Sequence, residues 1–541
     1  MQHTANQRTL PKAPGRVLTG LVVLLLVALG LLRFAYLNAD FPTGFPLGFG
    51  VKGMLYTDEG WWSRNAVAWV REGRWYIDDG YNPIVNLPVL PLLQAVWFKV
   101  FGISLTTARA LTATATLGVS ALVYVFARRE ISPRWAWLAP FLVVSNYAIF
   151  AFSRLALLEM PMLLLMLLSL WLASLGRRSS TLTTIGSAAV LVVAALTKTT
   201  ALFALPLLVF VVFCQHKSRQ TNIRHVLIWL LCFGLLYCAY HVFFVRVKPE
   251  SYEYFSSYNL SGKLIHRTFL SYIDGPARAV RRSLQLFPVL FPCLLISMVF
   301  LVKQAAYRKS FLFRISLFWS CLSMAAFSVS NYAPPRYFVV LIVPIALVIP
   351  LALQSLFEGA ALAEGAAGGA VSGLYPVRRQ LRLPRDRFLH NKRWQAWLLG
   401  GVFSVAIALS LARIGLYLRA PDFSFNAMAK AVSAQVAASP NASRVVMGPF
   451  ADTVALAAPI EAINDDMGFR SLSYRFTELN PGYYLFVGPV EEAGNIADFD
   501  HEAPRVLPDY FTLELVDTFE VFQNRIYPES VSLYRLTAKS Q

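Results

Sequence analysis

Several charged residues whose types could do chemistry stand beside apolar stretches of this 541-residue chain. Asp58 and Glu59 follow Tyr56, and a carboxylate can act as a general base toward a hydroxyl group, for which one of the two is enough. Adjacent side chains in a short segment cannot point the same way. One carboxylate could therefore face a reacting hydroxyl while the other holds the loop or a positive group. A plainer alternative is that Asp58 caps a helix over residues 61–71.

Further charges lie at the ends of apolar stretches. Arg109, Arg154, Lys198 and Arg336 each stand at such an end, and Glu159 lies one turn into another stretch. A charge at or inside a bilayer costs several kcal/mol unless it is paired or hydrated, so these residues are functional candidates. For each arginine the alternative is a side chain that reaches the lipid headgroups, and for Glu159 it is a buried ion pair.

The elements that must position these charges are apolar helices. Hydrophobic residues make up 56% of the chain and charged residues only 15%, with a mean hydropathy of +0.52, which excludes an ordinary soluble enzyme. Stretches of roughly 20 apolar residues predict a polytopic α-helical membrane protein. We expect eleven spans, near residues 17–37, 107–127, 135–152, 156–175, 182–197, 199–213, 225–246, 286–302, 312–329, 337–357 and 395–417.

The distribution of positive charge predicts the topology. Lys and Arg collect in the short loops on one side if residues 1–16 form a cytoplasmic tail, which places the external loops at 38–106 and 247–285. Residues 87–101 then fit an interfacial helix, and residues 182–213 fit either two spans or a re-entrant pair. All the charges named above lie on the outer side.

The second external loop is basic and rich in tyrosine. His266 and Arg267 lie within it, and its composition suits either a mobile lid over an anionic headgroup or a basic interfacial loop. The membrane part, residues 17–420, together with the tail, holds 41 basic and 14 acidic residues, whereas residues 421–541 hold 8 and 16. The net charge of +19 therefore belongs to the membrane part, and we expect no nucleic-acid partner.

Residues 421–541 differ in pattern as well as in charge. Helical spacing over 425–437 precedes short apolar stretches at 444–447, 483–488, 512–522 and 530–536. This order predicts a small α/β domain, which the topology places outside the cytoplasm. All five cysteines lie in or beside apolar segments, so no disulfide framework is expected.

A set of short motifs, in this order, resembles the bacterial membrane glycosyltransferases of the GT-C fold. That group includes the lipid A aminoarabinose transferases and is related to the protein O-mannosyltransferases. The resemblance covers roughly residues 17–357 and departs at Asn86-Leu87-Pro88, where aminoarabinose transferases often carry a Lys before Pro-Pro-Leu. The motifs are Tyr56-Thr57-Asp58-Glu59-Gly60, Gly73-Arg74-Trp75-Tyr76, Phe98-Lys99-Val100-Phe101-Gly102, Thr107-Ala108-Arg109-Ala110-Leu111, Arg128-Arg129, Leu196-Thr197-Lys198 and Arg336-Tyr337.

The resemblance implies a site on the outer face. Asp58 matches the catalytic base, with Glu59 beside it as the second member of the acidic pair. Cations would bind the donor phosphate, and other polar groups would line the cavity. The expected phosphate ligands are Arg109, Lys198, Arg336 and Arg267; the expected cavity residues are Arg154, Glu159, Tyr337, Tyr56 and His266.

The function so implied is an inverting transfer of a sugar from a polyprenyl-phosphate donor to an acceptor hydroxyl. A lipid phosphate is an activated leaving group that needs positive charge, while the acceptor hydroxyl benefits from a base. The acceptor could be a lipid, a glycan or a protein, and no metal or cofactor is expected. The implied location is the plasma membrane of a bacterial cell, in glycosylation of the cell envelope. The alternative is a transporter or flippase of a lipid-linked or polar solute.

Overall fold

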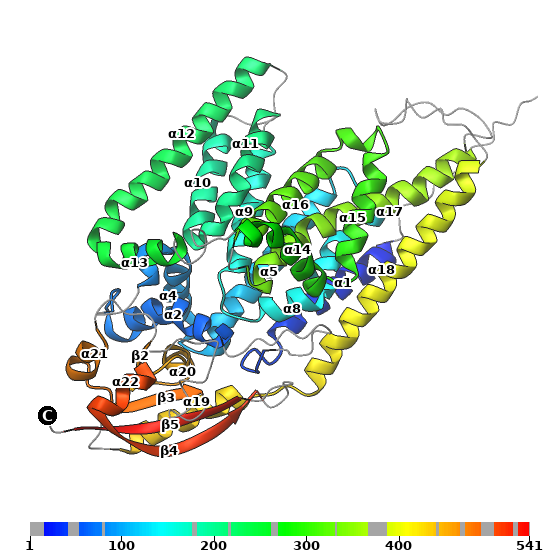
Figure 1. Ribbon diagram of the computed structural model, residues 1–541. Helices are drawn as coiled ribbons and strands as arrows, with labels where there is room; N and C mark the ends of the chain where they lie inside the picture. The colour runs from blue at the N-terminus through cyan, green and yellow to red at the C-terminus, as the bar shows by residue number, and fades with distance from the viewer. Residues whose placement is uncertain are drawn as a thin grey trace, which may run out of the picture.

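The computed structural model describes most of the chain, and every structural statement below concerns the described part. It comprises residues 16–41, 54–77, 82–175, 181–214, 218–260, 269–330, 333–365, 387–439, 443–465, 471–487, 503–522 and 529–539. Most of the described residues between 16 and 419 are helical, and a mixed α/β unit follows at one end of the helical bundle (Figure 1).

A helix lies at each of the eleven predicted spans. In some of them the helix is broken or lengthened by a short 3-10 segment. The helices are α1 (Arg16–Leu31), α5 (Leu105–Ala127), α6 (Pro133–Ala136), α7 (Leu138–Ser145), α8 (Tyr147–Ser153), α9 (Glu159–Ala173), α10 (Thr181–Thr197), η2 (Thr199–Ala204), α11 (Leu205–Phe213), α12 (Arg219–Phe243), α15 (Leu290–Val302), α16 (Phe311–Val329), η6 (Pro335–Leu341), α17 (Ile342–Gly365) and α18 (Arg387–Arg419).

Length and composition single out a smaller set as long enough to cross a membrane unaided. Five helices of the described chain qualify, or seven if two bent pairs each count as one span. The first pair, α6–α7 with α8, bends by 54°, and the second, α14 (Phe269–Leu286) with α15, bends by 113°. The chain is thus a helical membrane protein, whereas the count of eleven spans and the re-entrant alternative for residues 182–213 stay predictions.

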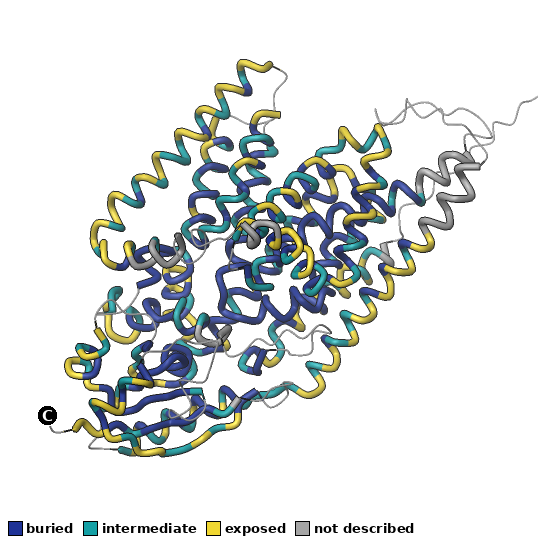
Figure 2. Tube along the Cα trace, in the orientation of Figure 1, coloured by how far each residue is buried: buried dark blue, intermediate teal, exposed yellow. Residues whose placement is uncertain are grey.

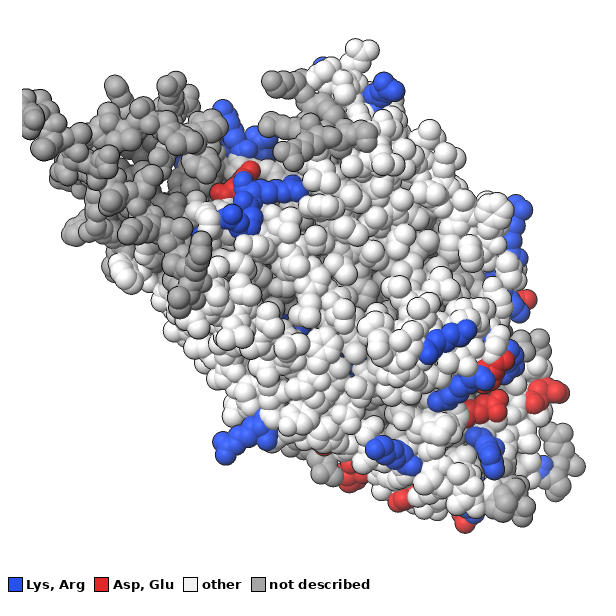
Figure 3. Space-filling view, turned by 180° about the vertical axis from the view of Figure 1, so that it is seen from behind, with Lys and Arg blue, Asp and Glu red and all other residues white. Residues whose placement is uncertain are grey.

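Burial separates the centre of the bundle from its lipid-facing rim. The most apolar window of the η6–α17 helix is 94% buried, whereas that of α12 is only 11% buried. A helix that is apolar on all sides belongs in a core, and α17 lies in the middle of the bundle (Figure 2). Figure 3 shows a broad face without Lys, Arg, Asp or Glu between charged ends, as expected for a surface in contact with lipid.

The described part of the predicted first external loop folds into helices at the end of the bundle where the α/β unit lies (Figure 1). They are α2 (Met54–Glu72), α3 (Pro83–Asn86) and α4 (Val89–Phe101). With 13 residues, α4 is shorter than a perpendicular span, and Gly102 ends it with a φ of +80°. The ammonium of Lys99 lies 3.9 Å from the ring centroid of Trp69, which ties α4 to α2. Part of the second loop forms α13 (Pro249–Leu260).

The C-terminal unit contains a five-stranded sheet in the order β2-β1-β3-β5-β4. Its two β1 pairings are parallel, and β3–β5 and β4–β5 are antiparallel. Four strands coincide with the predicted apolar stretches, and the helix expected at 425–437 is α19; the short strand β2 was missed. The elements are α19 (Ser424–Ala438), β1 (Val445–Met447), α20 (Ala451–Ala457), β2 (Glu461–Ile463), α21 (Leu472–Glu478), β3 (Tyr483–Val487), α22 (Ala503–Tyr510), β4 (Phe511–Val521) and β5 (Glu529–Ala538).

Candidate active site

The acidic pair lies inside α2, in its second turn. Because α2 begins at Met54, Asp58 is an interior helical residue, and the alternative that it caps a helix over 61–71 is wrong. Successive residues of a helix point about 100° apart, so Asp58 and Glu59 face different surroundings. Glu59 is fully buried, whereas the Asp58 side chain keeps 17% of its surface exposed.

Glu59 and Arg109 form a buried, two-pronged ion pair. Arg109 Nε donates to Glu59 Oε1 at 2.8 Å and Nη2 donates to Oε2 at 2.6 Å, and Oε1 also accepts the backbone N–H of Ala156 at 2.7 Å. Arg109 Nη1 donates to the carbonyls of Leu37 and Ala39 at 2.8 and 2.6 Å. Both side chains have at most 1% exposure, and the pair joins α2 and α5 to the chain at residues 37–39. The expected role of Arg109 as a phosphate ligand stays a prediction.

Asp58 belongs to a second group of charges. Its carboxylate lies 2.6 Å from Nη2 of Arg336, whose Nε lies 3.3 Å from Oε1 of Glu159. Lys198 Nζ donates to that same Glu159 oxygen at 2.5 Å and stands 4.1 Å from the ring centroid of Tyr337. We call these five residues the Asp58 cluster. The structure thus brings together the predicted base, two of the predicted phosphate ligands and two of the predicted cavity residues.

Four separate elements supply the Asp58 cluster. Asp58 comes from α2 and Glu159 is the first residue of α9, where a carboxylate also interacts favourably with the helix dipole. Lys198 stands in an extended conformation between α10 and η2, and Arg336 with Tyr337 lies at the start of η6. Each of the charged residues therefore sits at a helix end or in α2, where its charged group can meet the others.

The Asp58 cluster balances its charge, with two carboxylates and two cations. Side-chain exposure falls from 17% at Asp58 to 10% at Arg336 and Lys198 and 5% at Glu159. Charges so far removed from water are stable only when they are paired, and Glu159 pairs with both cations. Asp58 is therefore the most exposed of the four charged residues in the cluster.

Arg154 holds the backbone of residues 33–36 in place. Its guanidinium donates to the carbonyls of Arg33, Ala35 and Tyr36 at 2.9, 2.5 and 2.6 Å, and to the hydroxyl of Tyr417 at 3.2 Å. It is only 2% exposed. These contacts tie residues 33–36 to α8 and α18, and Glu159 pairs with Lys198 and Arg336 instead of Arg154. The expected cavity-lining role of Arg154 stays a prediction.

The remaining candidates lie outside the described residues or only partly within them. His266 and Arg267 fall in 261–268, which is not described. Tyr56 lies in the first turn of α2, and its side chain is not described. Asn86, at the departure from the family motif, is buried and donates from Nδ2 to the carbonyl of Ser251 at 3.2 Å, which joins α3 to α13.

The sequence analysis missed the contact between α2 and the C-terminal unit. The backbone N–H of Gly60 donates to Oγ1 of Thr453 at 3.0 Å, and a guanidinium nitrogen of Arg64 lies 3.8 Å from a carboxylate oxygen of Asp452. Arg71 donates to the carbonyl of Ala455 at 2.8 Å. A possible signal was the spacing of positions 60, 64 and 71, which share one face of a helix.

The contact between α2 and α20 buries two charged side chains that are not in close contact. Arg64 and Asp452 are both buried, and within the described residues the nearer oxygen of Asp452 accepts no hydrogen bond. Burial raises the pKa of Asp452, and the Arg64 cation opposes that rise. Elsewhere in the described chain, no three His, Cys, Asp or Glu side chains lie close enough together to bind a metal ion.

Comparison with known proteins places this geometry in context. Residues 83–244 match the family model of the dolichyl-phosphate-mannose-protein mannosyltransferases. Among curated proteins no relative matches the chain. The matched segment runs from α3 to α12 and so includes Arg109, Glu159 and Lys198.

Solved structures resemble almost the whole chain. ArnT from Cupriavidus metallidurans in the apo state has a TM-score of 0.58 at 15% identity, covering 96% of this chain and 98% of that one. The same protein bound to undecaprenyl phosphate has a TM-score of 0.58 at 14% identity, with the same coverage. The archaeal oligosaccharyltransferase AglB from Archaeoglobus fulgidus, in complex with an inhibitory peptide and a dolichol-phosphate, has a TM-score of 0.54 at 13% identity, covering 97% and 77%. The predicted resemblance to the GT-C fold is thereby confirmed.

Proposed function

We propose that this chain is a membrane glycosyltransferase that moves a sugar from a polyprenyl-phosphate donor to an acceptor hydroxyl with inversion at the anomeric carbon. The observation that carries the proposal is the Asp58 cluster, in which a partly exposed carboxylate lies against the buried cation Arg336, and Glu159 links that cation to a second one, Lys198. The fold, shared with ArnT and AglB, and the mannosyltransferase family match support the same class of enzyme.

In the proposed step, Asp58 accepts the proton of the acceptor hydroxyl. The acceptor oxygen bonds to C1 of the sugar as the bond from C1 to the phosphate oxygen breaks, and that electron pair leaves with the polyprenyl phosphate. A single displacement of this kind inverts C1 and needs no second nucleophile. A well-placed general base contributes typically 10²–10⁴-fold to such a rate.

Arg336 couples the base to the leaving group. In the resting protein its guanidinium lies against the ionised Asp58 at 2.6 Å. When Asp58 takes up a proton, that ion pair weakens in the same step in which negative charge develops on the leaving phosphate. The positive charge of Arg336 then becomes available to the phosphate, and Lys198 adds a second positive charge nearby.

The comparisons guide the choice of substrates for this chain. ArnT has been solved with undecaprenyl phosphate and AglB with a dolichol-phosphate and an inhibitory peptide. We infer a polyprenyl-phosphate donor here, and a lipid, glycan or protein acceptor. The site would face the outside of a bacterial plasma membrane, with the N-terminus in the cytoplasm and the C-terminal unit outside, as the positive charges of the loops predict.

The transporter or flippase alternative is not favoured. A transporter commonly shows repeated halves with ionisable groups near the middle of the bilayer. Here the cluster joins a helix of an external loop to the ends of membrane helices, and both the family match and the fold neighbours are glycosyltransferases.

The test is sugar release from a defined donor. Wild type, Asp58→Asn and Asp509→Asn would each be purified and mixed with radiolabelled polyprenyl-phosphate sugars and a membrane extract as acceptor. Asp509 is an exposed residue of α22 and serves as the matched control. We expect wild type and D509N to release free polyprenyl phosphate, and D58N to be at least about 100-fold slower.

Two outcomes would count against the proposal. Equal turnover by D58N and wild type would remove Asp58 from the role of base. Binding of the donor without turnover by any variant would instead favour transport.

A further inference from the structure

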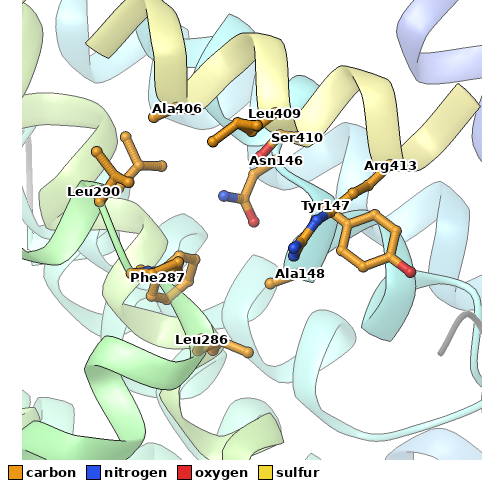
Figure 4. Close-up of a pocket in the computed structure, with 12 residues that line it drawn as sticks. Asn146, Tyr147, Ala148, Leu286, Phe287, Leu290, Ala406, Leu409, Ser410 and Arg413 are labelled. Carbon is orange, nitrogen blue, oxygen red and sulfur yellow. The ribbon is translucent and has the colours of Figure 1, made fainter. Parts of the chain in front are cut away.

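Two broken helices and the last membrane helix enclose a pocket that shares no residue with the Asp58 cluster. Its walls are the α7–α8 break at 146–148, the α14–α15 break at 286–290, and one face of α18 (Figure 4). The space between them measures about 510 Å³, its open mouth included. Both bent helix pairs of the described chain, at 54° and 113°, have their breaks in this pocket.

Broken helices at membrane depth are informative because they expose backbone polar groups. Such breaks are tolerated where they line a cavity or are buried in protein, and in membrane proteins they often form ligand sites. The Asn146 side chain caps α8 by accepting the N–H of Ile149 at 3.0 Å. One break is therefore stabilised locally, and its amide group is directed into the pocket (Figure 4).

The pocket is polar at one end and apolar at the other. Arg413 and Ser410 of α18 and Asn146 supply the polar end, while Phe287 and Leu409 belong to the apolar part. Figure 4 shows the Arg413 guanidinium and the Asn146 amide directed toward the same space. A guanidinium beside a hydroxyl and an amide provides several hydrogen-bond donors for one anion.

The positive charge of Arg413 is not compensated by an acidic side chain within the described residues. Arg413 is half-buried and lies four residues before the predicted outer end of the last span, at 417. Within the described residues it makes no ion pair, and its contact with Tyr147 is a ring contact at 5.9 Å. An arginine at this depth costs several kcal/mol unless an anion or water compensates it.

The bilayer is the side from which an anion would arrive. α18 lies at the rim of the bundle, where its most apolar window is only 22% buried, and Leu409 at the pocket is 55% exposed. A lipid could therefore place its phosphate against Arg413 and its hydrocarbon chain along the apolar part.

We propose that this pocket binds the phosphate group of a lipid, with Arg413 as its main ligand and Asn146 and Ser410 as hydrogen-bond partners. The headgroup is a phosphomonoester or phosphodiester, which polyprenyl phosphates and glycerophospholipids share. The site is distinct from the Asp58 cluster, so the proposal does not depend on the glycosyl transfer proposed above.

Lipid retention measured by native mass spectrometry tests the site. The full-length protein in detergent would be offered dioleoyl phosphatidic acid, dioleoyl phosphatidylglycerol, undecaprenyl phosphate, the neutral dioleoylglycerol, or inorganic phosphate. Arg413→Gln removes the main ligand, and Arg419→Gln is the matched control, because Arg419 is an exposed residue six positions later on the same helix. We expect R413Q to retain one anionic lipid fewer than both wild type and R419Q, and dioleoylglycerol to show no such difference.

A second variant keeps the charge of Arg413 and fills part of the pocket. Ala406→Phe introduces a ring into the pocket wall, at a position that is 8% exposed, and should remove the same single lipid even if R413Q fails to fold. Equal lipid retention by wild type, R413Q and A406F would overturn the site and leave Arg413 as a headgroup-directed side chain. Displacement of the lipid by millimolar inorganic phosphate would overturn the lipid as ligand.

Discussion

At the scale of single residues, the adjacent carboxylates of Asp58 and Glu59 lie in different surroundings. Glu59 is closed off by Arg109 and the backbone of Ala156, whereas Asp58 remains partly exposed and contacts a cation that is shared with Glu159. One helical step separates a structural acid from a candidate base. The sequence analysis expected one of the two carboxylates to hold a positive group, and Glu59 does so with Arg109.

Arg109→Lys should destabilise the protein more than it affects donor binding. Lysine keeps the charge but cannot form the two-pronged contact with Glu59 together with those to Leu37 and Ala39. Complete loss of one partner of a buried pair costs about 3–5 kcal/mol, and R109K loses part of that, so we expect a lower Tm in detergent and an unchanged KM for the donor in the folded fraction.

Arg308→Lys, at an exposed position on the predicted cytoplasmic side, is the control and should leave Tm unchanged. A raised donor KM in R109K with an unchanged Tm would return Arg109 to the role of phosphate ligand.

Glu159 and Lys198 should be strongly coupled. Lys198→Met leaves Glu159 with Arg336 alone, and Glu159→Gln removes the carboxylate that Lys198 and Arg336 share, so each single variant should be destabilised. The double variant removes both charges and should lose less stability than the sum of the two, by about 0.5–3 kcal/mol. Unfolding by SDS in mixed micelles measures all four proteins. Additive losses would show that the pair is not coupled.

The sequence could locate the Asp58 cluster but not assign every charge. Asp58, Glu159, Lys198 and Arg336 were found because charges beside apolar helices are costly and rarely accidental. Arg109 and Arg154 satisfy the same rule, yet both donate to backbone carbonyls of residues 33–39, Arg109 in addition to its pair with Glu59. No residue-type pattern marks a carbonyl as the partner of an arginine, so their structural role could not be predicted.

At the scale of elements, α2 joins the candidate base to the C-terminal unit. A Cβ on Gly60 would lie 2.1 Å from the backbone nitrogen of Thr453 in α20, so α2 and α20 approach as closely as glycine allows. Asp58 lies two residues before this contact. The position of the base thus depends on how α2 rests on α20.

Gly60→Ala should lower kcat with little change in the KM for the donor. The methyl group forces α2 away from α20, at a cost of about 1–3 kcal/mol, and a shift of about 1 Å in a catalytic group can cost about 100-fold in rate. Gly415→Ala is the matched control, because a Cβ at Gly415 of α18 meets nothing within 4 Å. Full activity in G60A would show that α20 does not position the base.

Elements were predictable where their pattern was long. The apolar spans and the strands β1, β3, β4 and β5 all carried enough apolar residues to be seen. β2 contains only three residues at the sheet edge, none of them fully buried, so its pattern was too short. The first turn of α2 was missed because its apolar and polar residues did not mark a helix start.

At the scale of the whole molecule, a second contact fastens the C-terminal unit to the membrane part. Asp40, just after the first span, accepts the Ser424 hydroxyl at 2.6 Å at the start of α19. The backbone N–H of Phe425 donates to the same carboxylate at 3.3 Å. Burial, with some help from Asp422, raises the pKa of Asp40 from 3.8 to about 6, against the effect of these hydrogen bonds.

This shift predicts how stability depends on pH. Between about pH 4 and pH 6 the folded protein holds a proton on Asp40 that the unfolded chain releases, so the stabilisation is full below pH 4 and is lost as the pH rises through 6. Wild type should therefore have a higher Tm at pH 5 than at pH 7.5. Asp40→Asn, which is neutral throughout, should show a smaller difference, while Asp509→Asn should behave as wild type. Part of the difference should persist in D40N, because the raised pKa of Asp452 acts in the same direction, and Asp40→Asn/Asp452→Asn should reduce it further. An equal pH dependence in wild type and D40N would show that Asp40 is ionised in the folded protein.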